Sequence, residues 1–228
     1  MLKQFLLPTL LLASTMSNPI ECDLTQHKDN SLWDNTNVAI NIDSYWLESP
    51  LEAVRRKYIA NFVGNIYQGN ESFLEIGSGS GLIYKEIVPR FISNDKYTGI
   101  DSSKNMLAIS RMRYLKGDFR KDDLFNLTLN DNSFDVVAAF EVFGHLPSIE
   151  KPVSEMFRVA KRMVVFTLWT AEKTNCTYEH IEDTTFVHYA YSQSDVMDII
   201  ARNLDGQNYS VAVVSLPDGI SGYLIFKQ

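Results

Sequence analysis

The 228-residue sequence has only two cysteines, Cys22 and Cys176. Two thiols cannot form a four-cysteine zinc cage and allow at most one internal disulfide, so the sequence leaves their pairing open. Basic residues are also scarce, because 21 Lys and Arg face 28 Asp and Glu and leave a formal net charge of −7. Since this sign opposes binding to a phosphate backbone, we expect no nucleic-acid partner.

Long apolar runs are missing as well. The run Phe5–Leu12 is interrupted by Pro8 and is far shorter than the roughly 20 residues that span a membrane, so we expect no stable membrane span. Because Lys3 precedes this run and small residues follow it, residues 1–17 have the pattern of a secretory signal peptide; an uncleaved apolar leader packed on the domain is the open alternative. Residues 18–44 are rich in Asn and Asp, which predicts a polar tether.

The remaining residues, 45–228, alternate apolar segments with amphipathic ones. A helix is expected from Pro50, because Ser49 and Glu52 form a capping box at its start. The expected strands are 72–76, 96–100, 113–116, 134–140, 163–168, 209–215 and 222–227, and the later helices are 82–88, 103–112, 153–160 and 194–204. This alternation predicts one α/β domain with a Rossmann-like, doubly wound, mostly parallel sheet of seven strands. The link between the last two strands is too short for a crossover helix, so they should pair antiparallel.

A glycine-rich loop, Gly77-Ser78-Gly79-Ser80-Gly81, follows the first expected strand and precedes a helix. In this context glycines let a ligand approach the backbone, and free N–H groups at the helix N-terminus favour its polar groups. Ser80 and Leu82 occupy positions at which a dinucleotide loop would need glycine. The pattern is therefore Glu-x-Gly-x-Gly-x-Gly, with Glu75 at its start.

Carboxylates follow the strands that neighbour this loop. Asp101 ends the second expected strand, and Asp118 follows the third. Because the carboxyl ends of parallel strands meet at one edge of a sheet, Glu75, Asp101 and Asp118 should lie around one crevice. There Asp101 can accept hydrogen bonds from both hydroxyls of a ribose, and Asp118 can accept one from the exocyclic amine of adenine.

These motifs resemble those of class I S-adenosylmethionine-dependent methyltransferases, and the resemblance extends over residues 45–228. The similar segments are residues 73–81 for the first motif of that family, 99–103 with 106–107 for the second, 116–118 for the third, and 134–137 with 140–146 for the fourth strand. Residues 140–143 replace the Asp/Asn-Pro-Pro-aromatic motif of methyltransferases that act on adenine or glutamine. The pattern is nearest to methyltransferases that act on small molecules.

The resemblance implies S-adenosylmethionine as the cofactor and a small-molecule methyl acceptor as the partner. The cofactor-binding residues that it implies are Glu75, Gly77, Ser78, Gly79 and Gly81 for the methionine end, Asp101 with the adjacent Ser102 for the ribose, and Asp118 with the backbone of Phe119 for the adenine. In-line methyl transfer depends mainly on positioning, so catalytic residues leave a weak sequence signal.

Two residues after the fourth expected strand are candidates for catalysis. His145 titrates near neutrality and is a candidate base if the acceptor must lose a proton; a structural or exposed histidine is the alternative. Glu141 is expected to face the amino group or sulfonium of the cofactor, or else to be a plain loop acid. His180 and His188 lack a matching set of acids, so no metal site is predicted. Candidates for an aromatic acceptor pocket are Tyr45, Trp46, Trp169, His188, Tyr189 and Tyr191, with core packing as the alternative.

Three functions agree with this pattern: a methyltransferase, a non-catalytic S-adenosylmethionine-binding regulator, and a nicotinamide-dependent oxidoreductase. The spacing of the glycine loop disfavours the third. Because the cofactor is made inside cells, we expect a cytoplasmic working site, with export through the N-terminal leader as the alternative. The sequence specifies neither the acceptor atom nor the oligomeric state.

Overall fold

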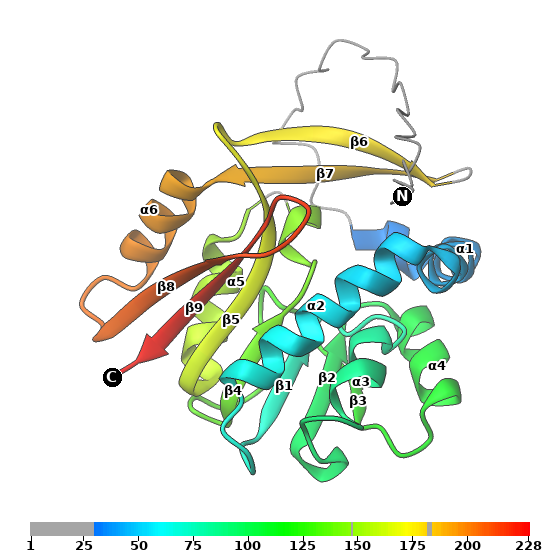
Figure 1. Cartoon of the computed structure of the whole chain (residues 1–228), viewed down its shortest axis with the longest axis horizontal. Coiled ribbons are helices and arrows are strands. Elements are labelled where there is room, and N and C mark those ends of the chain that lie inside the picture. Colours follow the sequence, from blue (N-terminus) through cyan, green and yellow to red (C-terminus); the bar gives the residue numbers. More distant parts are fainter. Residues whose placement is uncertain (1–29, 147, 182–183) are drawn as a thin grey trace, which may run out of the picture.

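A computed structural model shows the fold of residues 30–146, 148–181 and 184–228 (Figure 1). Cys22, the apolar leader over residues 1–17 and the first part of the expected tether lie outside the described residues. Within the described ranges, no helix combines the length and the apolar character needed to cross a lipid bilayer.

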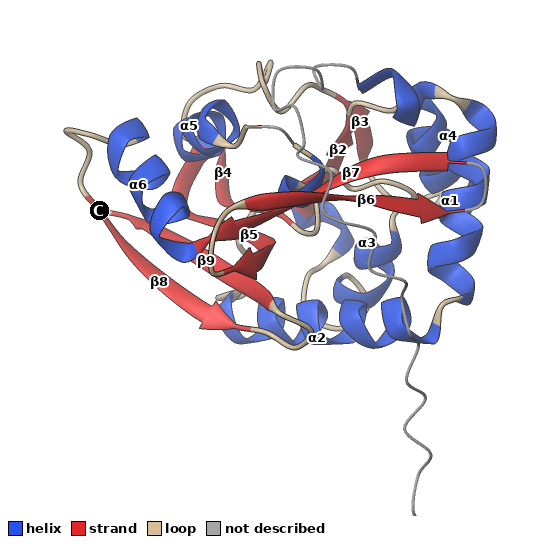
Figure 2. Ribbon diagram, turned by 90° about the horizontal axis from the view of Figure 1, so that it is seen from above, coloured by secondary structure: helices blue, strands red, loops and turns tan. Residues whose placement is uncertain are grey.

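A mixed sheet forms the centre of the molecule (Figure 2). Its parallel part has the order β3-β2-β1-β4-β5, β9 runs antiparallel to β5, and β8 pairs antiparallel with β9. These strands are β1 (Phe73–Ile76), β2 (Tyr97–Asp101), β3 (Phe119–Lys121), β4 (Phe134–Ala139), β5 (Ala160–Ala171), β8 (Tyr209–Ser215) and β9 (Ile220–Lys227). The predicted α/β class, the mostly parallel sheet and the C-terminal antiparallel pair are confirmed.

Helices cover both faces of this sheet. They are α1 (Thr36–Glu48), α2 (Pro50–Ile66), α3 (Leu82–Ile87), α4 (Lys104–Arg113), α5 (Glu150–Val159) and α6 (Gln193–Asn203), with short 3-10 helices η1 (Asn30–Asp34), η2 (Asn94–Lys96) and η3 (Phe143–His145). α2 and α3 pack on one face with Val136, whereas α5 and α6 pack on the other face with Val137. Because adjacent residues of β4 enter opposite cores, this strand is apolar almost throughout.

The sheet also contains a hairpin that the sequence analysis does not predict. β6 (Asn175–Ile181) and β7 (Thr184–Ser192) pair antiparallel, and β7 continues the sheet beside the end of β5. Figures 1 and 2 show this hairpin crossing above the parallel strands. Near its tip, Ile181 and Phe186 pack with Val38 and Ile42 of α1. The hairpin therefore joins the C-terminal half of the chain to the N-terminal helices.

Two expected segments differ from the structure. The strand expected at residues 113–116 is wrong, because α4 continues to Arg113 and a turn leads to β3 at Phe119. The second half of the expected tether is also wrong, because residues 30–44 contain η1 and most of α1. The Asn35 side chain accepts hydrogen bonds from two backbone N–H groups of α1, so an Asn-rich stretch here caps a helix.

Candidate functional site

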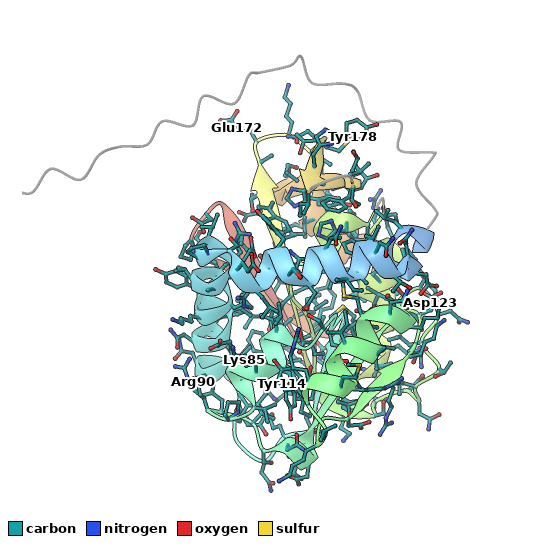
Figure 3. All side chains as sticks on the ribbon, turned by 90° about the vertical axis from the view of Figure 1, so that its right-hand side faces the viewer. Lys85, Arg90, Tyr114, Asp123, Glu172 and Tyr178 are labelled. Atoms are coloured by element: carbon teal, nitrogen blue, oxygen red, sulfur yellow. The ribbon has the colours of Figure 1, made fainter. Side chains whose placement is uncertain are left out.

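A cavity of about 490 Å³ lies at the carboxyl ends of the parallel strands. Its wall comes from the glycine loop, the ends of β2, β4 and β5, the N-terminal helices and the β6–β7 hairpin. In Figure 3, Tyr178 of the hairpin lies above α1, and Asp123 lies below the helix near its N-terminal end. Both residues line the cavity. Parallel α/β sheets bind their ligands at this edge.

The glycine loop has a conformation that favours glycine. Gly77, Gly79 and Gly81 have φ angles of 69°, 52° and 82°, values that other residues rarely adopt. A Cβ at Gly77 would lie 2.3 Å from Val142 Cγ2, so this glycine is also needed for packing. A Cβ at Gly79 would meet no atom closer than 4.0 Å. Since Gly79 lines the cavity, its backbone faces open space.

Asp101 connects this loop to the start of α4. Its Oδ2 accepts a hydrogen bond from the Gly79 N–H at 2.8 Å, and its Oδ1 accepts one from the Ser103 N–H at 2.8 Å. Burial raises the pKa of Asp101, while the two backbone hydrogen bonds oppose that shift. Each carboxylate oxygen keeps a second lone pair, so Asp101 can still accept hydrogen bonds from a ligand in the cavity.

Glu75 lies at the inner end of the cavity and is almost fully buried. Its Oε2 accepts a hydrogen bond from the Tyr97 hydroxyl at 2.5 Å. Burial raises the pKa of Glu75 to about 8, although this hydrogen bond opposes the shift. The carboxyl group is therefore largely protonated at neutral pH, and in that form it can donate a hydrogen bond.

The position expected for Asp118 is wrong. Asp118 precedes β3, and its carboxylate forms an ion pair with Arg120 at 2.7 Å and accepts a hydrogen bond from Thr98. Phe119 is buried in the core with Tyr84 and Tyr97. The cavity is lined by neither residue, because β3 begins later than the sequence suggests.

Two acids that the sequence analysis missed stand at the carboxyl end of β3. Asp122 and Asp123 directly follow this strand and line the cavity. The carboxylate of Asp122 accepts hydrogen bonds from Thr128, whereas Asp123 uses Oδ1 to accept one from the Phe125 N–H. A correct strand boundary would have pointed to this pair.

Glu141 lies at the end of β4 in a charged cluster. Its φ is 56°, and its N–H donates to Thr167 Oγ1 at 2.9 Å. Its Oε1 is 3.5 Å from Arg55 Nε, and Arg55 also pairs with Glu52 at 2.6 Å. Glu141 lines the cavity together with Arg55. The acid is thus part of an ion-pair network that connects α2 with the sheet.

His145 belongs to a wall of aromatic rings that meet edge-on or stack. Its ring centroid lies 5.5 Å from that of Trp33 and 5.5 Å from that of His188. Burial, with a smaller contribution from His188, lowers the pKa of His145 to about 4. The imidazole is therefore neutral at physiological pH and has the form that a base requires.

The predicted aromatic candidates divide into two groups. Tyr45, Trp46, Trp169 and His188 line the cavity. Tyr189 and Tyr191 belong to the buried core instead, so core packing is their role. No group of three or more His, Cys, Asp or Glu side chains suited to a metal ion occurs in the part of the chain that the structure describes.

Comparison with known sequences points to one family. The methyltransferase domain family matches residues 74–168. The demethylmenaquinone methyltransferase of Thermotoga maritima is 32% identical over 92 residues, which make up 40% of this chain and 40% of that protein. A probable S-adenosylmethionine-dependent methyltransferase of Mycolicibacterium smegmatis is 35% identical over 103 residues, 44% of this chain and 38% of that protein. The matches thus span less than half the length of these two relatives.

Comparison with solved structures extends the likeness to most of the chain. Magnesium protoporphyrin IX methyltransferase from Synechocystis PCC 6803, solved with bound SAH, has a TM-score of 0.64 at 13% identity. The superposition covers 87% of this chain and 97% of that chain, which shows a common fold. Residues 74–168 thus match the methyltransferase domain family, and most of the chain shares the fold of this solved methyltransferase.

Proposed function

We propose that this protein transfers the methyl group of S-adenosylmethionine to a small-molecule acceptor by in-line displacement. One observation carries the proposal: the same cavity contains the glycine loop with Asp101 and the aromatic wall with His145. A donor and an acceptor bound in one cavity can react without diffusing, which is the main requirement of this chemistry. The Thermotoga relative and the Synechocystis neighbour are both named for methylation of small molecules.

In this proposal the cofactor lies along the carboxyl ends of β1, β2 and β3. The backbone of Gly77, Gly79 and Gly81 contacts the methionine end beside Glu75, and Asp101 accepts hydrogen bonds from the ribose hydroxyls. Support comes from the cavity-lining positions of Gly77, Gly79, Glu75 and Asp101 and from the lone pairs that Asp101 keeps.

For the adenine we propose Asp123 in place of Asp118. Asp123 lines the cavity, and its Oδ2 can accept a hydrogen bond from the exocyclic amine while Oδ1 stays with Phe125. Asp118 is held by Arg120 and Thr98 on the other end of β3. Asp123→Ala should therefore weaken cofactor binding, and Asp118→Ala should not.

The cationic sulfonium would lie between Glu141 and the aromatic wall. Glu141 supplies negative charge there, although Arg55 neutralises part of it. Trp46 and Trp169 also line this part of the cavity and can contact a sulfonium through their ring faces. We propose His145 as the base for an acceptor that must lose a proton.

Calorimetry with S-adenosylmethionine, S-adenosylhomocysteine and NAD in turn tests the cofactor. We expect the first two to bind and NAD not to bind, because the loop lacks dinucleotide spacing. Tight binding of NAD alone would favour the oxidoreductase alternative. Release of S-adenosylhomocysteine in the presence of acceptors separates an enzyme from a non-catalytic regulator, which would bind without turnover.

We propose a working site inside the cell, where the cofactor is made. N-terminal sequencing and fractionation of the native protein test this location. A mature chain that begins near Asn18 and occurs only in a compartment without S-adenosylmethionine would contradict it.

A further inference from the structure

An aromatic box built by four separate elements borders the cavity, and all of its rings except Phe186 line it. Its rings are Trp33 of η1, His145 of η3, Trp169 of β5, and Phe186 and His188 of β7. Trp33 stacks on Phe186 with 5.8 Å between ring centroids, and Trp169 meets His188 edge-on at 4.0 Å. His145 lies 5.5 Å from both Trp33 and His188. Flat surfaces of this kind bind planar ligands by stacking.

His145 has a buried ring nitrogen in this box. Its Nδ1 has no hydrogen-bond partner among the described residues. In the neutral tautomer whose Nε2 carries the proton, Nδ1 carries a lone pair. The box therefore contains a buried acceptor atom without a partner, and such atoms are rare in folded proteins.

A second ring nitrogen supports the same interpretation. Nε2 of His188 is also buried and lacks a hydrogen-bond partner within the described ranges. A Cβ at Gly144 would lie 3.0 Å from this atom and 2.7 Å from the Trp169 ring. Glycine at position 144 therefore keeps the two rings of the box free of a neighbouring side chain.

Neither histidine adds a positive charge to the box. Burial lowers the pKa of His145 to about 4 and also lowers that of His188, where the positive charge of Arg55 contributes. Both rings are therefore neutral near pH 7. The guanidinium of Arg55 lies 5.8 Å from the centre of the Trp169 ring and pairs with Glu52 and Glu141.

Building on the proposed methyl transfer, we infer that the acceptor is a planar aromatic molecule whose hydroxyl group donates a hydrogen bond to Nδ1 of His145. The acceptor oxygen forms a bond to the methyl carbon. The bond from that carbon to sulfur breaks, and its electron pair stays on sulfur as a neutral thioether. The hydroxyl proton passes to Nδ1, and the imidazolium later releases it to water.

The low pKa of His145 suits a methyl acceptor with a hydroxyl group better than one with an amino group. An oxygen that gains a methyl group while it keeps its proton is far more acidic than an imidazolium, so even a weakly basic imidazole can take that proton. A methylated amine holds its proton much more tightly than His145 can. The low pKa of His145 is thus matched to O–H acceptors.

Binding of three matched probes tests this inference without turnover. The probes are 2-naphthol, its methyl ether 2-methoxynaphthalene, and the cationic 2-naphthylmethylamine, titrated by calorimetry into the full chain saturated with S-adenosylhomocysteine. We expect 2-naphthol to bind about tenfold more tightly than the ether, because only the naphthol donates to Nδ1. The amine should bind more weakly than the naphthol.

Variants test whether the preference for naphthol over its ether depends on His145. His145→Phe keeps an aromatic ring and should abolish the preference for naphthol over its ether, whereas His145→Asn offers an amide oxygen near the place of Nδ1 and should keep part of it. His180→Phe is the matched control, because His180 lies on the exposed β6 strand and contacts Thr185. This control should retain the full preference.

Three results would overturn the inference: equal affinity for naphthol and ether, tightest binding of the amine, or an unchanged preference in His145→Phe. If the histidine variants do not fold, the comparison of probes on the unmodified chain still decides. Failure of S-adenosylhomocysteine to bind would overturn the proposed function together with the inference. Normal S-adenosylhomocysteine binding with equal probe affinities would overturn the inference alone.

Discussion

At the carboxyl end of β2, the Asp101 carboxylate holds the Gly79 N–H and the Ser103 N–H in place. The hydroxyl of Ser103 in turn donates to the backbone carbonyl of Trp33. A chain of three hydrogen bonds therefore connects the proposed ribose site with the aromatic box. Substitutions at these positions should therefore change contacts with a bound ligand. They should also change the relative positions of the two halves of the cavity.

Loss of the Asp101 carboxylate should weaken cofactor binding at least about tenfold, because hydrogen bonds to charged groups are each worth roughly 1.5–3 kcal/mol. Calorimetry of Asp101→Asn with S-adenosylhomocysteine measures the effect while it keeps the size of the side chain. Asp118→Ala is the control, since Asp118 pairs with Arg120 away from the cavity. A loss of affinity in Asp118→Ala with none in Asp101→Asn would contradict the assignment.

A side chain at Gly79 should reduce cofactor affinity by a similar factor. Valine there would have to adopt a φ of 52° and would project toward the cavity. Gly206→Val is a matched control, because Gly206 has a φ of 76° and an added Cβ would meet no atom within 4 Å. Both variants carry backbone strain, so a difference in affinity between them isolates the effect on the site. Equal affinities in the two folded variants would count against the loop assignment.

The buried Glu75 should make stability depend on pH. Burial raises its pKa from 4.5 to about 8, so between these values the folded state holds a proton that the unfolded state has released. The free energy of unfolding should therefore fall as pH rises from about 4.5 to about 8. Urea unfolding at pH 5, 6.5 and 8 measures this free energy, and Glu75→Gln should make it less dependent on pH. An identical slope in this variant would show that other groups cause it.

The β6–β7 hairpin forms one side of the cavity. It supplies Phe186 and His188 to the box, and near its tip Ile181 packs in the cluster that includes α1. Loosening the hairpin should therefore disturb the acceptor side of the cavity more than the cofactor side.

Phe186→Ala tests this separation of the two sides. Phe186 is buried and stacks on Trp33, so its loss should cost roughly 3–5 kcal/mol if the structure does not rearrange. We expect weaker binding of 2-naphthol with little change in S-adenosylhomocysteine affinity. Val214→Ala on the edge strand β8, where Val214 is exposed, should change neither. Equal losses for both ligands in Phe186→Ala would show that the hairpin supports the whole cavity.

The elements also show which parts of the structure follow from sequence. β1, β2, β4 and the last two strands are predicted within a few residues, because each is a short apolar run bounded by turn residues. β3 has only three residues, of which only Phe119 is buried, so its pattern is too weak to place it. β6 is largely exposed and carries many polar residues, and its apolar Ile181 packs with residues of α1, a contact between distant segments that the local sequence does not reveal. Because β3 is expected too early in the sequence, Asp118 is predicted at its carboxyl end, where the structure has Asp122 and Asp123.

On the scale of the whole molecule, contacts between segments that are distant in the sequence hold the walls of the cavity together. α1 is fixed to the end of α4 by a bidentate pair in which Arg113 donates to both carboxylate oxygens of Asp43, at 3.0 Å and 2.6 Å. Arg113 also donates to the carbonyl of Ser80 in the glycine loop at 3.2 Å. The N-terminal helix, the glycine loop and the hairpin are therefore connected, which explains why residues far apart in the sequence line one cavity.

A crystal structure of the full chain with S-adenosylhomocysteine tests the central claim most directly. The account predicts the ribose hydroxyls within hydrogen-bond distance of Asp101, the adenine beside Asp123, and the sulfur facing the aromatic box of His145. Adenine bound beside Asp118, or a ligand outside this cavity, would contradict the account.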